Sequence, residues 1–240
     1  MDRVVTVNDS LAQILASRYH IPMPVVLMNC SYTLPEVKSD KIRQRLGLND
    51  DRKIILYQGG YAYTTKALED LVLSAQFIQD GIIVFMGFGN TQKLESLIEE
   101  KGLASKVKIL NPVPHWELHE YVSSADVGVI PLINNNLNNY LSSPSKIFEY
   151  LMGGVAIAGN DFPEIRKIVG DSAGKFFDSL APEDIARVIN EMIADENKLE
   201  MMKQNARQTA LTKYNWEMES RKLLDLYKDI FDETREKRRK

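Results

Sequence analysis

The sequence predicts an α/β fold built on a doubly wound, parallel six-stranded sheet of the Rossmann-like type, with extra helices at its C-terminal end. Three observations predict it. Short apolar, β-rich runs alternate with amphipathic stretches of helical period between residues 53 and 178. Most of these runs are apolar almost without interruption, which is typical of strands buried on both faces. After residue 181, helical stretches follow one another without a strand between them.

Residues 1–50 precede this alternation and are too few for a domain of their own. A short strand, a helix and a second short strand are expected first, at Arg3–Val7, Ser10–Tyr19 and Val25–Leu27. Pro35–Asp51 follows as a polar connection with one helical turn. We therefore expect residues 1–50 to be the remnant of a preceding domain, followed by its linker.

Residues 51–215 are expected to form the main domain. Its six strands are predicted at Lys53–Gly59, Gly81–Gly87, Val107–Leu110, Val127–Leu132, Val155–Gly159 and Gly174–Asp178. Its helices are predicted at Lys66–Gln79, Gln92–Gly102, Pro114–Ser124, Pro144–Gly153, Pro182–Ala194 and Asn197–Tyr214.

Residues 216–240 are expected to add a C-terminal helix, Trp216–Arg235, and a basic tail. The tail, Arg235–Lys240, holds five basic side chains and one acidic side chain. A run of charge at a terminus is usually a frayed, solvated end, and we expect one here. A tail that binds a membrane or a nucleic acid is the alternative.

The composition limits the class of function. Lys and Arg number 30 against 33 Asp and Glu, so the net charge is 30 − 33 = −3. This balance gives no general attraction to nucleic acid or to an anionic membrane. The one cysteine, Cys30, excludes a disulfide within the chain and fits a reducing compartment, and three histidines argue against a multi-histidine metal site. No apolar run approaches 18 residues and the first residues do not resemble a signal peptide, so we expect a cytoplasmic protein.

Two glycine-rich turns lie where a ligand is expected, because open parallel sheets bind ligands at the carboxyl ends of their strands. Gln58-Gly59-Gly60 follows the first strand of the main domain, and Lys66 opens the next helix. Gly87-Phe88-Gly89 follows the second strand. Glycines allow close approach of the backbone, and a lysine near a helix N-terminus neutralises phosphate. The spacing fits neither the dinucleotide fingerprint nor a Walker loop, and plain tight turns are the alternative.

A proline-rich loop follows the third strand. Asn111-Pro112-Val113-Pro114 leads into a helix that carries Glu117. Two prolines leave few backbone donors and fix the directions of the others. A ligand-binding loop and a rigid turn with Pro114 at the first helical position are both consistent with this sequence.

The most informative stretch is residues 140–154, where Ser143 suits an N-cap and Pro144 suits the first helical position. The free N–H groups of that helix start favour an anion such as phosphate. Lys146 in the first turn opposes the helix dipole, and a bound anion would remove this conflict. Glu149 lies on the same face and can accept two hydrogen bonds from a vicinal diol, as in ribose. An exposed Lys–Glu pair is the alternative.

Together these motifs resemble the C-terminal, donor-binding domain of retaining glycosyltransferases with the GT-B fold, in family 4 of such enzymes. The similarity runs from about Val4 to Phe231. Its most specific part is Ser-Pro-Ser-Lys-Ile-Phe-Glu-Tyr at residues 143–150, followed by Gly153-Gly154 and an apolar strand. The glycine turns, Asn-Pro-Val-Pro, residues 124–132 and Tyr214-Asn215-Trp216 add to it.

The resemblance implies roles for the same residues. Lys66 and Lys146 would be the catalytic residues, which hold the diphosphate of a nucleotide sugar and stabilise it as it leaves. Val113 would lie near the base and Glu149 would bind the ribose hydroxyls. The candidate substrate-binding residues are Gly59, Gly60, Gly87, Gly89, Val113, Glu117, Ser143, Pro144, Ser145, Ile147 and Glu149. The acceptor would be a glycan or a lipid-linked sugar, no metal or cofactor is expected, and peripheral attachment to the inner membrane face is left open.

The sequence departs from the family in three ways. Leu141 stands where many members carry a second glutamate, and Gly60 stands where many carry an arginine. By this resemblance, the N-terminal domain that binds the acceptor would be absent from these 240 residues, except for a last strand and helix expected at Arg3–Tyr19. We therefore expect an incomplete enzyme, and a non-catalytic nucleotide-sugar-binding subunit with a separate partner chain is the alternative. A sugar-nucleotide epimerase ranks lower, because no acid–base pair for it is evident.

Overall fold

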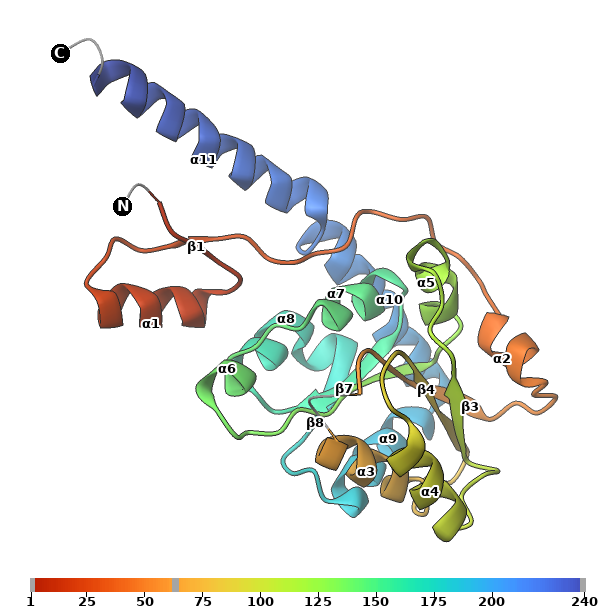
Figure 1. The fold of residues 1–240 in the computed structure, drawn as a ribbon. Coiled ribbons are helices and arrows are strands. Elements are labelled where there is room, and N and C mark those ends of the chain that lie inside the picture. The colour runs from red at the N-terminus through yellow and green to blue at the C-terminus, as the bar shows by residue number, and fades with distance from the viewer. Residues whose placement is uncertain (1–2, 62–64, 238–240) are drawn as a thin grey trace.

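The computed structural model describes residues 3–61 and 65–237, and it confirms the predicted fold class (Figure 1). Six parallel strands form one sheet in the order β5-β4-β3-β6-β7-β8. The order reverses between β3 and β6, which is the topological switch point of a doubly wound sheet. The strands are β3 (Lys53–Gln58), β4 (Gly81–Met86), β5 (Val107–Leu110), β6 (Val127–Ile130), β7 (Ala156–Asn160) and β8 (Gly174–Phe177).

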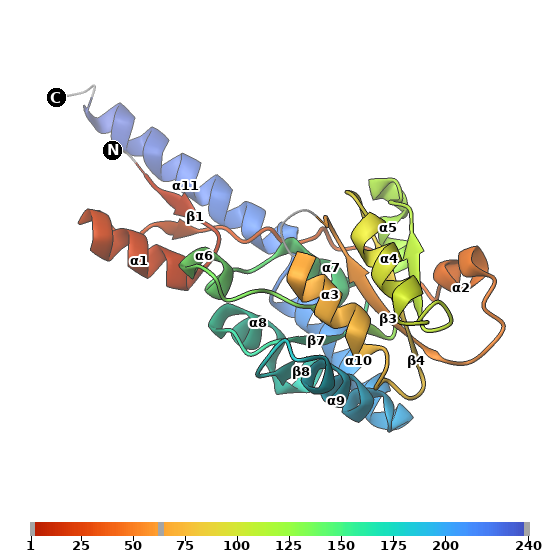
Figure 2. The ribbon, with the colours of Figure 1, turned by 60° about the horizontal axis from the view of Figure 1, so that its bottom comes forward.

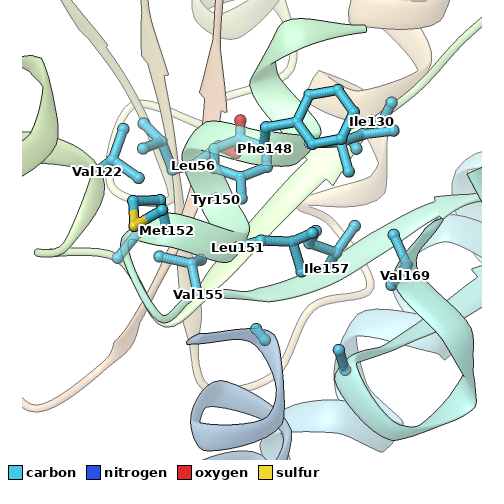
Figure 3. Packing of buried hydrophobic residues seen from close by; sticks show 14 of the residues in the cluster. Leu56, Val122, Ile130, Phe148, Tyr150, Leu151, Met152, Val155, Ile157 and Val169 are labelled. Carbon is cyan, nitrogen blue, oxygen red and sulfur yellow. Dashed lines mark hydrogen bonds between the residues drawn. The ribbon is translucent and has the colours of Figure 1, made fainter. Parts of the chain in front are cut away.

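Helices cover both faces of the sheet. One face carries α5 (His115–Val122), α7 (Ser145–Met152), α8 (Pro163–Ala173) and α10 (Glu196–Thr212). The other face carries α3 (Thr65–Ser74), α4 (Gln92–Glu100) and α9 (Pro182–Ile193). Side chains of β3 point alternately to the two faces of the sheet. Ile54 and Leu56 belong to the core under α5, α7, α8 and α10, called the first core, and Ile55 and Tyr57 belong to the second core, under α3, α4 and α9. Figure 3 shows the first core around α7 and β7.

Most of the predicted helices lie within two residues of their expected bounds, with one clear correction. The first helix of the main domain ends at Ser74, not at Gln79, and the backbone continues as a turn in which Ala75, Gln76 and Phe77 each bond back three residues. Two helices were not predicted: α6 (Leu137–Tyr140) and α8. The single turn expected in the polar connection is α2 (Lys41–Leu46).

The two ends of the chain lie together on one side of the sheet. A small parallel pair, β1 (Val5–Thr6) and β2 (Val25–Val26), brackets α1 (Asp9–Tyr19), and α11 (Trp216–Lys237) runs past them (Figures 1 and 2). Arg3 pairs with Glu233 near the end of α11. The expected helix from Trp216 is thus confirmed. It continues to Lys237, so Arg235–Lys237 of the expected frayed tail are helical, and Arg238–Lys240 lie outside the described residues.

Candidate functional site

The loops after β3 and β4 touch each other at the carboxyl edge of the sheet. The Gly59 amide donates to the Met86 carbonyl at 3.0 Å, and a Cβ at Gly87 would lie 1.8 Å from the Gly59 oxygen. Gly59 and Gly89 have φ angles of 138° and 125°, which only glycine adopts without strain. The structure therefore brings the predicted glycines Gly59, Gly60, Gly87 and Gly89 together, with their backbone open to close approach.

Tyr150 places α7 against this edge. Its buried hydroxyl donates to the Leu56 carbonyl and accepts from the Gln58 amide, both at 3.0 Å. Its ring fills the space above Gly128, where a Cβ would lie 2.5 Å from a ring carbon. These two hydrogen bonds fix the distance between the end of β3 and the middle of α7. The first turn of α7 therefore lies at the topological switch point of the sheet.

Lys146 lies in that first turn with its ammonium group at the Gly59 turn. A Cβ on Gly59 would be 3.1 Å from Lys146 Nζ, and Nζ stands 4.1 Å from the centroid of the Tyr57 ring. Burial lowers the pKa of Lys146 to about 8, although the nearby Glu149 carboxylate opposes this. A partly desolvated cation at a helix N-terminus is unfavourable by itself, and an anion bound there would stabilise both.

Glu149 faces the same space one turn later. It accepts a hydrogen bond from the Gln58 side chain, and burial raises its pKa against the effects of that bond and of Lys146. It also lines a cavity of about 490 Å³ with the first turn of α5, including His115 and Trp116. The Trp116 side chain is 82% exposed. A carboxylate at the edge of such a cavity can accept hydrogen bonds from a diol.

The start of α7 differs from the prediction by one residue. The N-cap is Pro144, with ψ of 142°, and the helix begins at Ser145, so Ser143 is not the cap and Pro144 is not the first helical residue. The extended backbone of Pro144 sets this start, and the Ser143 hydroxyl accepts a hydrogen bond from the Asn8 side chain at 3.2 Å. Within the described residues, no side chain caps α7. The first N–H groups, of Ser145 and Lys146, therefore face the site without a side-chain acceptor.

Three other predicted residues contact side chains other than Lys146 and Glu149. Lys66 bonds Asp70 at 2.5 Å and lines a separate hollow between α3 and α4. Glu117 lies 3.8 Å from Lys41 of α2, on the linker side of α5. Val113 packs against the first core. Ile147 is fully buried and contributes only backbone to the site.

Sequence reasoning missed the side chains that hold the site in place. Tyr57, Gln58 and Tyr150 act between β3 and α7, and Asn8 reaches the loop before α7 from the other end of the chain. Alternation along β3 places Tyr57 and Gln58 on opposite faces, so no local pattern joined them to one site. Only Tyr150 gave a signal, since a polar hydroxyl stood in an otherwise apolar helix face.

Neither a metal site nor a membrane-spanning helix is found over residues 3–61 and 65–237. Among these residues, no group of three or more His, Cys, Asp or Glu side chains is arranged to hold a metal ion. Over residues 3–61 and 65–237, no helix combines the length and the apolar character needed to cross a bilayer.

Comparisons with known proteins point to one family. The sequence pattern of the family described as Glycosyl transferases group 1 matches residues 38–209. An uncharacterized glycosyltransferase from Methanocaldococcus jannaschii is 24% identical over 94% of this chain and 60% of its own length.

Solved structures share the fold. Sucrose-phosphate synthase from Thermosynechococcus elongatus superposes with a TM-score of 0.78 at 21% identity, over 96% of this chain and 59% of that chain. HepE from Anabaena, solved in complex with UDP and glucose, superposes with a TM-score of 0.76 at 14% identity, over 95% of this chain and 63% of that chain.

The chain thus spans about three fifths of the length of these proteins. The fold is the one found in GT-B glycosyltransferases. Since the family pattern covers most of the chain, from the linker through α10, the chain belongs to the glycosyl transferases group 1 family.

Proposed function

We propose that this chain is the donor-binding domain of a retaining GT-B glycosyltransferase of family 4, which binds a nucleotide diphosphate sugar at the start of α7. One observation carries the proposal. The Lys146 ammonium lies in the first turn of a helix without a side-chain cap, against the Gly59 backbone, at the switch point of the sheet. Helix N–H groups, a cation and an open glycine turn together form a site for a diphosphate.

The other candidate residues surround this position in a way that fits a nucleotide sugar. Glu149 would exchange its bond with Gln58 for the ribose hydroxyls. The cavity beside Glu149 is lined in part by α5, the helix that follows Val113. The base of the nucleotide would be held there. Ser143, Pro144, Ser145 and Ile147 would contribute backbone at the helix start. Lys66 would join the diphosphate by releasing Asp70.

The chemistry asked of this domain is electrostatic. When the bond between the anomeric carbon and the diphosphate breaks, negative charge grows on the leaving phosphate oxygen. Lys146 and the N–H groups of Ser145 and Lys146 would stabilise that charge, and their fixed position at the helix start would require little reorganisation during the reaction. The acceptor hydroxyl, which we infer to belong to a glycan or a lipid-linked sugar, attacks the anomeric carbon from the face that the phosphate leaves. It gives its proton to the leaving phosphate oxygen, and the product retains its configuration at the anomeric carbon.

Three features support a partner for this domain. β1 and β2 pair over two residues each, too little for an independent parallel sheet. α11 exposes a stripe formed by Leu224, Tyr227 and Phe231, each about two-thirds exposed. The proteins it resembles are longer by the remaining two fifths of their length. We infer that a preceding α/β domain completes the acceptor side, either in the same protein or as a partner chain.

Calorimetric titration with UDP-sugars and GDP-sugars tests the donor site. We expect one of them to bind and expect the Lys146→Met variant to lose binding, because the cation at the helix start is removed. Lys198→Met, at a side chain 74% exposed on α10, is the matched control and should bind as the wild type does. A folded wild-type chain that binds none of these donors at millimolar concentration contradicts the proposal.

The α11 stripe also favours the second candidate, a non-catalytic donor-binding subunit. The two candidates differ in what the chain does alone. Transfer of sugar by the purified chain at an ordinary enzymatic rate excludes the second candidate, and transfer only after addition of a partner chain supports it. Once transfer is observed, the anomeric proton coupling of the product by NMR reports whether the configuration is retained.

A further inference from the structure

Asn8 connects the N-terminal segment to the loop before α7. Its side chain is fully buried, and its amide nitrogen donates to the Leu141 carbonyl at 2.7 Å and to the Ser143 hydroxyl at 3.2 Å. Its amide oxygen accepts from the Leu11 N–H at 2.9 Å and caps α1. One side chain therefore fixes the start of α1 and, 133 residues away in sequence, the approach to α7.

The contact reaches the donor site through a short and rigid path. Leu141 and Ser143 are themselves buried, and the next residue, Pro144, has its φ fixed by the ring. A displacement of Ser143 therefore also displaces the first turn of α7. The groups that would move are the uncapped N–H groups and the Lys146 ammonium that stands over Gly59.

The N-terminal segment is held to the sheet domain at α8 as well. The Glu164 carboxylate accepts from the N–H and the hydroxyl of Ser10, and Lys167 pairs with Asp9. α1 also packs against β1 and β2, whose two-stranded sheet is too small to be complete. α1 would therefore follow any movement of the domain that completes this sheet.

We propose that Asn8 is a positioning residue of the donor site, which couples the position of α1 to the start of α7. The inference rests on the proposed donor site at α7. When the preceding domain approaches or withdraws, Asn8 transmits the change to the N–H groups and the ammonium that hold the diphosphate. Donor affinity then depends on a residue that does not itself touch the donor.

The test compares three variants of the full chain with the wild type and with Lys146→Met. It uses thermal unfolding and titration with UDP, or with GDP if the wild type binds only GDP. Asn8→Asp keeps an oxygen to cap α1 but replaces the amide nitrogen that holds Leu141 and Ser143. Asn8→Ser also keeps a good cap residue and is too short to reach Leu141. Asp195→Ala removes the cap of α10, which accepts from the N–H groups of Asn197 and Lys198, and serves as the control for lost stability.

We expect both Asn8 variants to weaken UDP binding by tenfold or more, and we expect Asp195→Ala to lower the melting temperature with UDP affinity within twofold of the wild type. If Asn8→Asp does not fold, Asn8→Ser decides the outcome. If neither folds, Ser143→Ala, which removes the hydroxyl that Asn8 contacts, is measured in their place with the same expected loss of affinity. Wild-type UDP affinity in the folded Asn8 variants, with binding lost in Lys146→Met, overturns the role of Asn8 and leaves the donor site standing. Failure of the wild type to bind UDP or GDP overturns the donor site, and the role of Asn8 with it.

Discussion

Lys146 combines two properties that seldom coexist in a side chain with only a structural role. Its ammonium is desolvated enough for the pKa to fall to about 8, and it lies in the first turn of a helix, where the dipole is unfavourable to a cation. The Tyr57 ring below it recovers part of this cost through a cation–π contact. The remaining cost is what a bound diphosphate would remove.

This imbalance predicts that Lys146→Met is more stable than the wild type. Since the pKa falls from 10.5 to about 8, the protonated form destabilises the fold by an amount on the order of 3 kcal/mol below pH 8. The difference in stability between the variant and the wild type should shrink as the pH rises from 8 towards 10.5, because Lys146 is then neutral in the folded wild type. Thermal unfolding at pH 7 and pH 9.5 measures it. A lower melting temperature for the variant at pH 7 would show that the ammonium stabilises the free protein.

The same pKa predicts how donor binding depends on pH. The diphosphate of a UDP-sugar does not titrate in this range and the uracil N–H titrates only above about pH 9, so a change in affinity between pH 7 and pH 9 comes from the protein. Binding should be strongest below pH 8 and weaken above it, by up to about tenfold per pH unit, with uptake of a proton. Calorimetry in two buffers of different ionisation enthalpy measures that uptake. Affinity that stays constant from pH 7 to pH 9 would exclude Lys146 as the group that binds the diphosphate.

Among single residues, the sequence predicted those at the glycine turns and the helix start better than those whose side chains hold these segments in place. Lys146 and the glycines were found because their types are unusual at a helix start or at a strand end. Asn8 was not, because its partners lie 133 and 135 residues away and depend on the fold. Lys66 and Glu117 stay predictions: in this structure they contact Asp70 and Lys41, through local helix geometry and the packing of α2.

The placement of α7 relative to β3 depends on Tyr150, which predicts the effect of Tyr150→Phe. The change leaves the Leu56 carbonyl and the Gln58 N–H without their buried partner. We expect a loss of about 1–3 kcal/mol in stability and weaker UDP binding, since α7 loses its fixed distance from the Gly59 turn. Denaturant unfolding and calorimetry measure the two effects. Unchanged UDP affinity in the variant would show that packing over Gly128 alone places α7.

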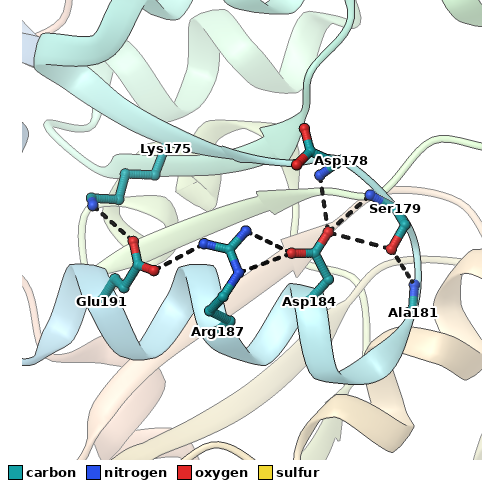
Figure 4. Close-up of polar contacts among 7 residues, drawn as sticks. All are labelled: Lys175, Asp178, Ser179, Ala181, Asp184, Arg187 and Glu191. Atoms are coloured by element: carbon teal, nitrogen blue, oxygen red, sulfur yellow. Dashed lines mark hydrogen bonds and ion pairs between the residues drawn. The ribbon is translucent and has the colours of Figure 1, made fainter.

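A matched element on the far side of the sheet serves as the control. Asp184 in the first turn of α9 accepts from the Ser179 N–H at 2.9 Å and the Asp178 N–H at 3.0 Å, and pairs with Arg187 (Figure 4). Asp184→Ala should lower the free energy of unfolding by about 1–2 kcal/mol through lost caps, without a change in UDP affinity. Both quantities are read from the same two assays. Weakened UDP binding in this variant would show that stability alone governs affinity.

Strands and helices of the main domain were predicted closely because their apolar runs are long and periodic. The α3 end was overestimated, since Ala75 and Ile78 continue the apolar pattern while the backbone turns away to reach β4. The break in α8 at Gly170, with φ of 64°, and the four residues of α6 leave too short a pattern to recognise.

For the whole molecule, the exposed stripe on α11 predicts a surface that binds other apolar groups. Replacing Leu224 and Phe231 by lysine should reduce binding of a hydrophobic dye and any self-association, while leaving the melting temperature nearly unchanged because both side chains are about two-thirds exposed. Dye fluorescence and sedimentation measure these effects. A large fall in melting temperature would mean that the stripe is packed within this chain.

The central claim, that a diphosphate binds at the first turn of α7, is tested most directly by backbone amide NMR during titration with UDP and GDP. We predict the largest shifts at the N–H groups of Gly59, Ser145 and Lys146, with smaller shifts around Glu149 and none on α9. Saturable shifts confined to another edge of the sheet, with these three amides unmoved, would contradict the account.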